Sequence, residues 1–170
     1  MPGEILACFS CTGKSHFVHE YYKKFDCVDH DMYDFAFASS KKIRDDWLRY
    51  YLERMRFFRK KYSLVLVNAT PEILEKLPST CPIVFPERGL VIEYRGRAQK
   101  RGSSQFFLQL QKEWDAWISA CEGHKSKYKY RLGAGEYLSD WMLKREHGGE
   151  SGWDGFLLKK YNDDWDYWDE

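Results

Sequence analysis

Residues near the N-terminus have the types and spacing of a phosphate-binding loop. Gly13-Lys14-Ser15 match the end of the pattern Gly-x-x-x-x-Gly-Lys-Ser/Thr, which joins a strand to a helix. In such a loop the backbone N–H groups surround phosphate oxygens, and the N-terminus of the helix adds a partial positive charge. We expect Lys14 to neutralise charge on the β- and γ-phosphates, and the Ser15 hydroxyl to ligate Mg²⁺. The predicted nucleotide-binding residues of the loop are Ser10, Cys11, Thr12, Gly13, Lys14, Ser15 and His16.

One position of the loop departs from the pattern. Cys8 stands where the first glycine is expected. It lies at the end of the predicted strand 4–9, where a small buried side chain can be accommodated. Two other interpretations are an ordinary strand–turn–helix with an exposed Gly-Lys, and a redox or metal half-site formed by the Cys-x-x-Cys pair Cys8 and Cys11. We disfavour the half-site, because the sequence has no second such pair to complete a zinc site.

Two carboxylates follow the second predicted strand, in the sequence Asp29-His30-Asp31. In an open parallel sheet the carboxyl ends of the strands line the ligand crevice. Carboxylates at that place can orient a metal-bound water or accept a proton from a hydroxyl acceptor. The alternative is a solvated turn, and the neighbouring phosphate loop favours the functional interpretation. We expect His30 to be a surface histidine and not a base, because phosphoryl transfer depends mainly on positioning and charge neutralisation.

The segment 88–102 is densely cationic. It could be a mobile lid whose arginines close over the transferring phosphates and exclude water. The alternative is a helix with a solvated basic face. The cations are Arg88, Arg95, Arg97, Lys100 and Arg101.

A longer basic stretch, residues 41–61, interleaves lysine and arginine with aromatic residues. Its apolar residues recur at helical spacing, which predicts an amphipathic helix. The aromatic side chains could stack on nucleic-acid bases. We favour the simpler interpretation, a helix that covers the sheet and has a basic outer face, so nucleic acid is not the favoured partner. Such a helix could still present Arg44 or Arg49 to an acceptor phosphate.

Strands and helices are predicted to alternate along the chain, which indicates a parallel α/β sheet. The clearest strand is 63–68, because a continuous apolar run suits a parallel strand covered on both faces. It ends in Asn68, where many nucleotide-hydrolysing enzymes have an acidic residue for the Mg²⁺ shell, so metal binding shifts to Ser15 and the Asp29/Asp31 pair. The predicted strands are 4–9, 25–31, 63–68, 82–86 and 128–132, and the predicted helices are 16–24, 41–61, 71–77, 104–121 and 136–146.

Length and composition restrict the class of protein. The 170 residues suit about one domain. A net charge of +1 does not indicate a nucleic-acid coat protein, and no apolar run approaches the length of a membrane span. The five cysteines and the absence of a signal-peptide pattern at the start favour a reducing, cytoplasmic location, without membrane association.

The C-terminal part differs in character. After residue 147 glycines punctuate the chain, and the last residues are acidic and aromatic. We predict a domain over 1–147 and an appended tail over 148–170. Trp165 and Trp168, with the aspartates around them, could bind a basic protein partner or imitate nucleic-acid charge. The alternative is that the tryptophans of the tail pack against the domain.

Taken together, these pieces resemble small P-loop kinase-like proteins of bacteriophages and bacteria, which are related to nucleoside and (deoxy)nucleoside monophosphate kinases. The resemblance covers about residues 4–143. It rests on segments 10–15, 29–31, 64–67, 84–86, 94–102, 114–118 and 135–140.

The resemblance implies a three-layer α/β fold with ATP on the phosphate loop and a location in the cytoplasm of a bacterial cell or infected host. The acidic pair also looks like the Asp-x-Asp of shikimate- and gluconate-type kinases, which implies that Asp29 would serve the metal shell with Ser15, and Asp31 the acceptor. The lid arginines would be among Arg95, Arg97 and Arg101. The loop Gly133-Ala134-Gly135 lies where such kinases often hold adenine.

The expected activity is therefore transfer of the γ-phosphoryl group of ATP, with Mg²⁺, to a small acceptor, and a (deoxy)nucleoside monophosphate is the leading candidate. A kinase of a hydroxyl acceptor, such as a nucleoside, a polynucleotide end or a small metabolite, is one alternative. The other is a non-catalytic nucleotide-binding protein that acts through a partner or nucleic acid.

Overall fold

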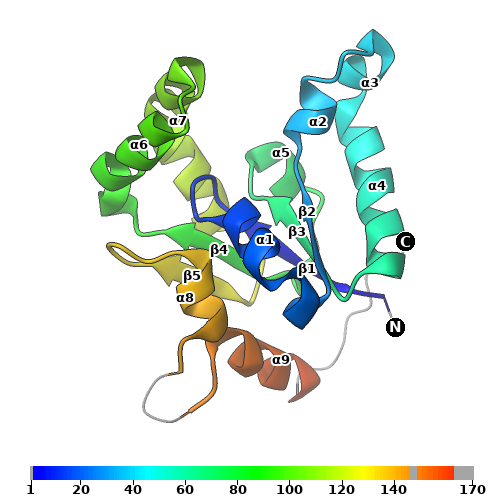
Figure 1. Cartoon of the computed structure of the whole chain (residues 1–170), viewed down its shortest axis with the longest axis vertical. Helices are drawn as coiled ribbons and strands as arrows, with labels where there is room; N and C mark the ends of the chain where they lie inside the picture. The colour runs from blue at the N-terminus through cyan, green and yellow to red at the C-terminus, as the bar shows by residue number, and fades with distance from the viewer. Residues whose placement is uncertain (1, 146–148, 163–170) are drawn as a thin grey trace.

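The alternating segments form a five-stranded, wholly parallel sheet with the order β2-β3-β1-β4-β5 (Figure 1). This arrangement comes from a computed structural model, which describes residues 2–145 and 149–162. The strands are β1 (Glu4–Cys8), β2 (Cys27–His30), β3 (Leu64–Asn68), β4 (Ile83–Pro86) and β5 (Lys129–Leu132). The predicted α/β class and a mostly parallel sheet of about five strands are confirmed.

Helices occupy most of the remaining described chain. They are α1 (Lys14–Phe25), α2 (Tyr33–Ala36), α3 (Lys41–Asp45), α4 (Trp47–Lys61), α5 (Pro71–Leu74), α6 (Val91–Lys100), α7 (Ser104–Gly123), α8 (Leu138–Leu143) and α9 (Gly152–Asn162), with a 3₁₀ turn η1 (Arg88–Leu90) before α6.

Alternation along the strands divides the core into two layers. On β1, Ile5 and Ala7 pack with α4, α5 and α7, whereas Leu6 and Cys8 face α1, α8 and α9. Successive side chains of a strand point to opposite faces, so a strand covered on both sides must be apolar throughout. β3 meets this requirement, since all five of its residues are buried.

β1 lies between β3 and β4 in the sheet. The chain leaves β1 toward one face of the sheet, and it leaves β3 and β4 toward the opposite face. The helix that follows β1 is α1, which packs on one side of the sheet, while α5 after β3 and α7 after β4 pack on the opposite side. The connections therefore diverge at the carboxyl end of β1. In open parallel sheets such a divergence opens a crevice for ligands.

Several helix boundaries differ from the predicted ones for local reasons. The stretch 41–61 is two helices, because Asp46 leaves the helical conformation at φ −130°. The Ser40 side chain caps the first of them by accepting from the Ile43 N–H. The basic segment 88–102 is mainly the helix α6, which packs against α7.

His30 is a correction to the sequence interpretation, because it is buried and not on the surface. Its ring lies 3.9 Å from that of Tyr51 in a stacked arrangement, and its Nε2 is 2.8 Å from the Tyr51 carbonyl oxygen. The Tyr51 hydroxyl in turn donates to the His30 carbonyl oxygen. Burial lowers the pKa of His30 to about 4, so the ring is neutral near pH 7.

Part of the predicted tail is helical and contributes to the core. Trp153 and Phe156 of α9 are buried against the α1–α8 side of the sheet, and Phe156 meets Tyr128 edge to face. Lys160 of α9 pairs with Glu4 of β1. Trp165, Trp168 and the acidic residues around them lie outside the described residues, and the boundary after residue 147 stays a prediction. Across the part of the chain that is described, no helix combines the length and apolar character needed to cross a membrane.

We predict that His30 makes stability sensitive to acid. The unfolded chain binds this proton at the ordinary pKa of 6.5 and the folded chain only near 4, so the free energy of unfolding falls as the pH drops through that window and levels off below it. Between pH 7.5 and 4.5 the loss from this group is about 2 to 3 kcal/mol. Urea unfolding at the two pH values measures it.

The control for this prediction is His30→Gln, which cannot take up the proton. All other titrating groups are common to both proteins, so the variant should lose about 2 to 3 kcal/mol less than the wild type over the same pH change. An equal loss in both would contradict the assignment.

Candidate functional site

The turn between β1 and α1 is held by backbone and side-chain bonds. Thr12 is fully buried and its hydroxyl donates to the Phe9 carbonyl oxygen at 2.8 Å. Cys11 and Gly13 have φ values of 63° and 89°, a region that glycine tolerates and other residues rarely adopt. A β-carbon at Gly13 would also lie 3.1 Å from the Tyr137 ring. The backbone conformation therefore favours glycine at position 13, and a β-carbon there would require a small shift of the Tyr137 ring.

Cys8 lies at the end of β1 with 1% of its surface exposed. Burial raises the pKa of its thiol far above the ordinary value, so the group is a neutral packing side chain. No cluster of three or more histidine, cysteine or carboxylate side chains suited to a metal occurs among residues 2–145 and 149–162.

Asp29 connects the two motifs that the sequence singled out. The Ser15 hydroxyl donates to its Oδ2 at 2.6 Å, and the Lys14 ammonium pairs with its Oδ1. Asp29 comes from β2 and Lys14 and Ser15 from the start of α1, so the contact reaches past β3, the strand that lies between β2 and β1. The Lys14 side chain is only 11% exposed.

A cavity of about 310 Å³, which we call the phosphate cavity, is bordered by the turn between β1 and α1. Its cations are Lys14 from α1 and three side chains from the end of the basic segment, Arg97, Lys100 and Arg101. The other side chains that border it include Ser15, His16, Asp31 and Tyr33. A small hollow with this concentration of positive charge, next to the N-terminus of a twelve-residue helix, suits a polyphosphate.

The three predicted lid arginines differ in position. Arg97 donates to the Cys11 carbonyl oxygen at 3.0 Å and to the Glu136 carbonyl oxygen at 2.8 Å, and its guanidinium lies 3.9 Å from the Tyr137 ring centroid. Arg97 therefore braces the loop. Arg101 lines the cavity with its Nη1 3.7 Å from Cys11 Sγ. Arg95 lies over the Phe107 ring at 5.4 Å and does not border the cavity.

The loop Gly133-Ala134-Gly135 uses two of its N–H groups within the protein. Gly133 donates to Glu136 Oε1 and Gly135 donates to Glu93 Oε1, each at 2.8 Å. None of the three residues borders the cavity. Tyr137, which follows them, does border it, and the next N–H, that of Leu138, donates to the Thr12 carbonyl oxygen. The residues that contact the phosphate loop are therefore Tyr137 and Leu138, which follow the Gly133-Ala134-Gly135 segment.

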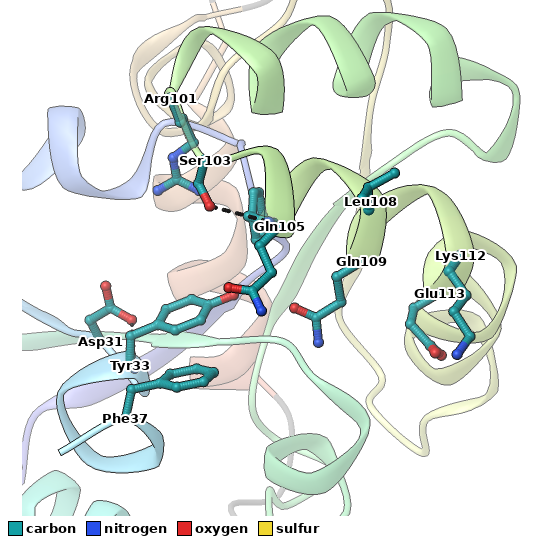
Figure 2. A pocket seen from close by; sticks show the side chains of 11 residues that line it. Asp31, Tyr33, Phe37, Arg101, Ser103, Gln105, Leu108, Gln109, Lys112 and Glu113 are labelled. Atoms are coloured by element: carbon teal, nitrogen blue, oxygen red, sulfur yellow. Dashed lines mark hydrogen bonds between the residues drawn. The ribbon is translucent and has the colours of Figure 1, made fainter. Parts of the chain in front are cut away.

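Asp31 lies where two hollows meet. Its Oδ1 accepts from the Tyr33 N–H at 3.0 Å, and the side chain borders both the phosphate cavity and a larger cleft of about 850 Å³. Figure 2 shows Asp31, Tyr33 and Phe37 on one side of this cleft, and Arg101 with the first turns of α7 on the other. Helices α6 and α7 and helices α2 and α3 stand on opposite sides of the site (Figure 1).

A third hollow, of about 390 Å³, shares Ser10, Tyr33 and Asn68 with the phosphate cavity. We call it the aromatic cavity, because Tyr33, Phe37, Trp47 and Trp117 border it. Its polar side chains include Thr70, Glu72, Gln109 and Glu113, and no lysine or arginine borders it. The sequence interpretation missed this set, whose members come from α2, α4, α5 and α7; the one local signal is the spacing of Gln109 and Glu113, one turn apart on a helix.

Ser15 and Asp29 fit a magnesium site of the kind that arrives with a nucleotide. Mg²⁺ prefers oxygen ligands, keeps several waters and binds through one or two protein oxygens plus substrate phosphates. The hydroxyl and carboxylate oxygens of Ser15 and Asp29 lie 2.6 Å apart, and Ser15 borders the phosphate cavity.

The basic stretch 41–61 is bound to its own surroundings. Arg44 donates to the Ala38 and Ser39 carbonyl oxygens, and Arg49 pairs with Asp46 and Glu53. Neither arginine borders the three hollows.

No protein-family model matches this chain, and no curated protein matches its sequence.

We predict that Arg97 and Arg95 respond differently to replacement by lysine. Arg97→Lys loses the planar contacts with Tyr94 and Tyr137 and the two bonds to carbonyl oxygens, which lysine cannot reproduce. The free energy of unfolding should fall by about 1 to 3 kcal/mol. Arg95→Lys on the same helix should change it by less than about 1 kcal/mol. Denaturant unfolding of both variants checks this, and equal losses would show that Arg97 has no special bracing role.

Proposed function

We propose that the protein is a phosphotransferase that moves the γ-phosphoryl group of ATP to a small acceptor, with a (deoxy)nucleoside monophosphate as the leading acceptor. The observation that carries the proposal is the joint contact with Asp29 of Lys14 and Ser15, two residues that border the phosphate cavity. It places a lysine, a hydroxyl and a carboxylate at the point where a strand-to-helix loop can hold phosphates.

The phosphate cavity supports the donor side of this reaction. Asp29 is the counter-charge of Lys14, and a triphosphate would take over that role as it binds. Lys14, Lys100 and Arg101 can then neutralise charge on the phosphates while Arg97 holds the loop in shape. Ser15 and Asp29 would hold a Mg²⁺ ion that arrives with the nucleotide, which would supply further neutralisation of the phosphate charge.

The acceptor side is supported by the continuity of the hollows. The aromatic cavity meets the phosphate cavity at Ser10, Tyr33 and Asn68. An acceptor with its ring among the aromatic side chains would point its phosphate toward Arg101 and the loop. A phosphate oxygen is already ionised, so this transfer needs positioning and charge neutralisation, with no strong base.

We predict that Lys14→Ala strongly reduces ADP formation. The assay supplies ATP, Mg²⁺ and a panel of nucleoside monophosphates, nucleosides and small hydroxy acids. Loss of the lysine charge at the phosphates should reduce turnover with the active acceptor by about 10²-fold or more.

Lys23→Ala is the matched control, because Lys23 lies in the last turn of the same helix and should leave turnover unchanged. Turnover that survives Lys14→Ala would refute the proposal. ATP binding that depends on Lys14, without transfer to any acceptor, would favour a non-catalytic nucleotide-binding protein.

A kinase of a hydroxyl acceptor is a second candidate, favoured by the position of Asp31. One of its oxygens accepts from the Tyr33 N–H while the side chain borders both the phosphate cavity and the cleft. A carboxylate at that place could accept the proton of an attacking hydroxyl.

Asp31→Asn separates the two candidates. With a monophosphate acceptor we expect kcat to fall by less than about tenfold, because no proton must be removed. With a hydroxyl acceptor the loss of the base should lower kcat by about 10² to 10⁴-fold. Steady-state rates of the variant with the acceptor found in the panel give the answer, and a large loss would replace the monophosphate with a hydroxyl compound.

A further inference from the structure

Several polar side chains of the aromatic cavity have no partners within the described protein, whereas Asn68 Oδ1 accepts from the Met32 N–H at 2.8 Å. Gln109, Glu113 and Glu72 border the cavity, and across residues 2–145 and 149–162 none of them makes a hydrogen bond or ion pair with another side chain or with the backbone. The Thr70 hydroxyl oxygen is buried there and also lacks a partner. Gln109 and Glu72 are exposed and Glu113 is partly buried, so their polar atoms are accessible to a ligand. The Thr70 oxygen is buried, and buried polar groups normally have a partner.

The walls of the cavity suit a flat ring. Tyr33 and Phe37 stack on each other with centroids 5.3 Å apart and planes 15° from parallel, and Phe37 is 69% exposed at the edge of the cavity. Trp47 and Trp117 border it from α4 and α7. Aromatic side chains stack readily on planar heterocycles, and an exposed ring gains when such a ligand covers it.

The charge of the cavity restricts which ring can bind. Among the described residues, two carboxylates and no lysine or arginine border it, so the part of a ligand that enters should not be anionic and should be rich in N–H donors. An ionised carboxylate accepts hydrogen bonds and donates none, whereas a glutamine amide does both. Glu113 and Gln109 are four residues apart on α7, so their side chains lie on the same face one turn apart.

Guanine matches this set better than the other bases. Its Watson–Crick edge has two adjacent donors, N1–H and the N2 amino group, next to the O6 acceptor. Adenine and cytosine place a ring-nitrogen acceptor beside their one amino group, and uracil and thymine place a carbonyl on each side of one N–H. Opposite any of these a carboxylate oxygen would face an acceptor.

We propose that the aromatic cavity selects a guanine base, with the Glu113 carboxylate accepting from N1–H and N2–H and the Gln109 amide donating to O6. This rests on the proposed function, in which the acceptor is a nucleotide. The acceptor is then a guanine nucleoside monophosphate, whose phosphate extends toward Arg101 and the phosphate loop. Glu113 and Gln109 determine specificity, and neither takes part in the transfer itself.

Binding measured by calorimetry in the absence of ATP tests this assignment. The probes are GMP, AMP, CMP, UMP and IMP, and IMP is guanine-like but lacks the N2 amino group. We expect GMP to bind at least about tenfold more tightly than each of the others, since a paired contact to a base edge discriminates by about 1 to 3 kcal/mol. The comparison of GMP with IMP uses the wild-type protein, so it does not depend on any variant folding.

Glu113→Gln should weaken GMP binding by at least about tenfold and leave AMP binding unchanged, because the amide places a donor opposite a donor. The matched control is Glu75→Gln, an exposed carboxylate that follows α5 and does not border the cavity. Equal affinities for GMP and IMP, tighter binding of another base, no binding of GMP, or a Glu113→Gln protein with unchanged preference would each overturn the assignment.

The outcome is separable from that of the proposed function. A guanine preference without any ADP formation would keep the base assignment and reject the transferase. Lys14-dependent transfer to AMP or a pyrimidine nucleotide would keep the transferase and reject the guanine assignment.

Discussion

The contact of Asp29 with Lys14 and Ser15 is the interaction on which the site depends. Lys14 is largely shielded from water, and a shielded ammonium without a counter-charge costs several kcal/mol. Asp29 supplies that charge from β2, and the hydrogen bond from Ser15 fixes its second oxygen. Since β2 is the edge strand and the loop follows the central strand, the same contact sets how the acidic loop, the aromatic residues of α2 and the phosphate loop lie relative to one another.

The order of the strands explains why two hollows of opposite character lie side by side. The phosphate cavity is lined by the loop after β1 and the end of α6, whereas the aromatic cavity is lined by residues in or next to α2, α4, α5 and α7. Both lie at the carboxyl end of the sheet, where the connections of β1 and β3 diverge to opposite faces. A ligand with an anionic end and a planar neutral end therefore has a place for each.

Much of the fold could be read from local patterns, because they need no knowledge of distant contacts. The apolar run of β3 is an example. Three features depended on tertiary packing that the sequence does not display. His30 was expected at the surface, yet Tyr51, twenty-one residues away, stacks on it. Arg95 and Arg97 read alike in the sequence, but two positions on a helix turn side chains to nearly opposite sides, so only one braces the loop. The aromatic cavity has contributors too far apart in sequence to form a pattern.

The cysteines give the chain an intrinsic chemical label. Cys8, Cys27, Cys81 and Cys121 are buried, and burial raises the pKa of each, to about 11 for Cys27 and about 12 for Cys81 and Cys121. Cys11 alone is partly exposed, at the border of the phosphate cavity and beside Arg101. Burial also raises the pKa of the Cys11 thiol, and the neighbouring Arg101 opposes the rise. Its accessibility makes Cys11 the favoured position for a maleimide dye or a ¹⁹F tag, which would place a spectroscopic reporter directly on the loop.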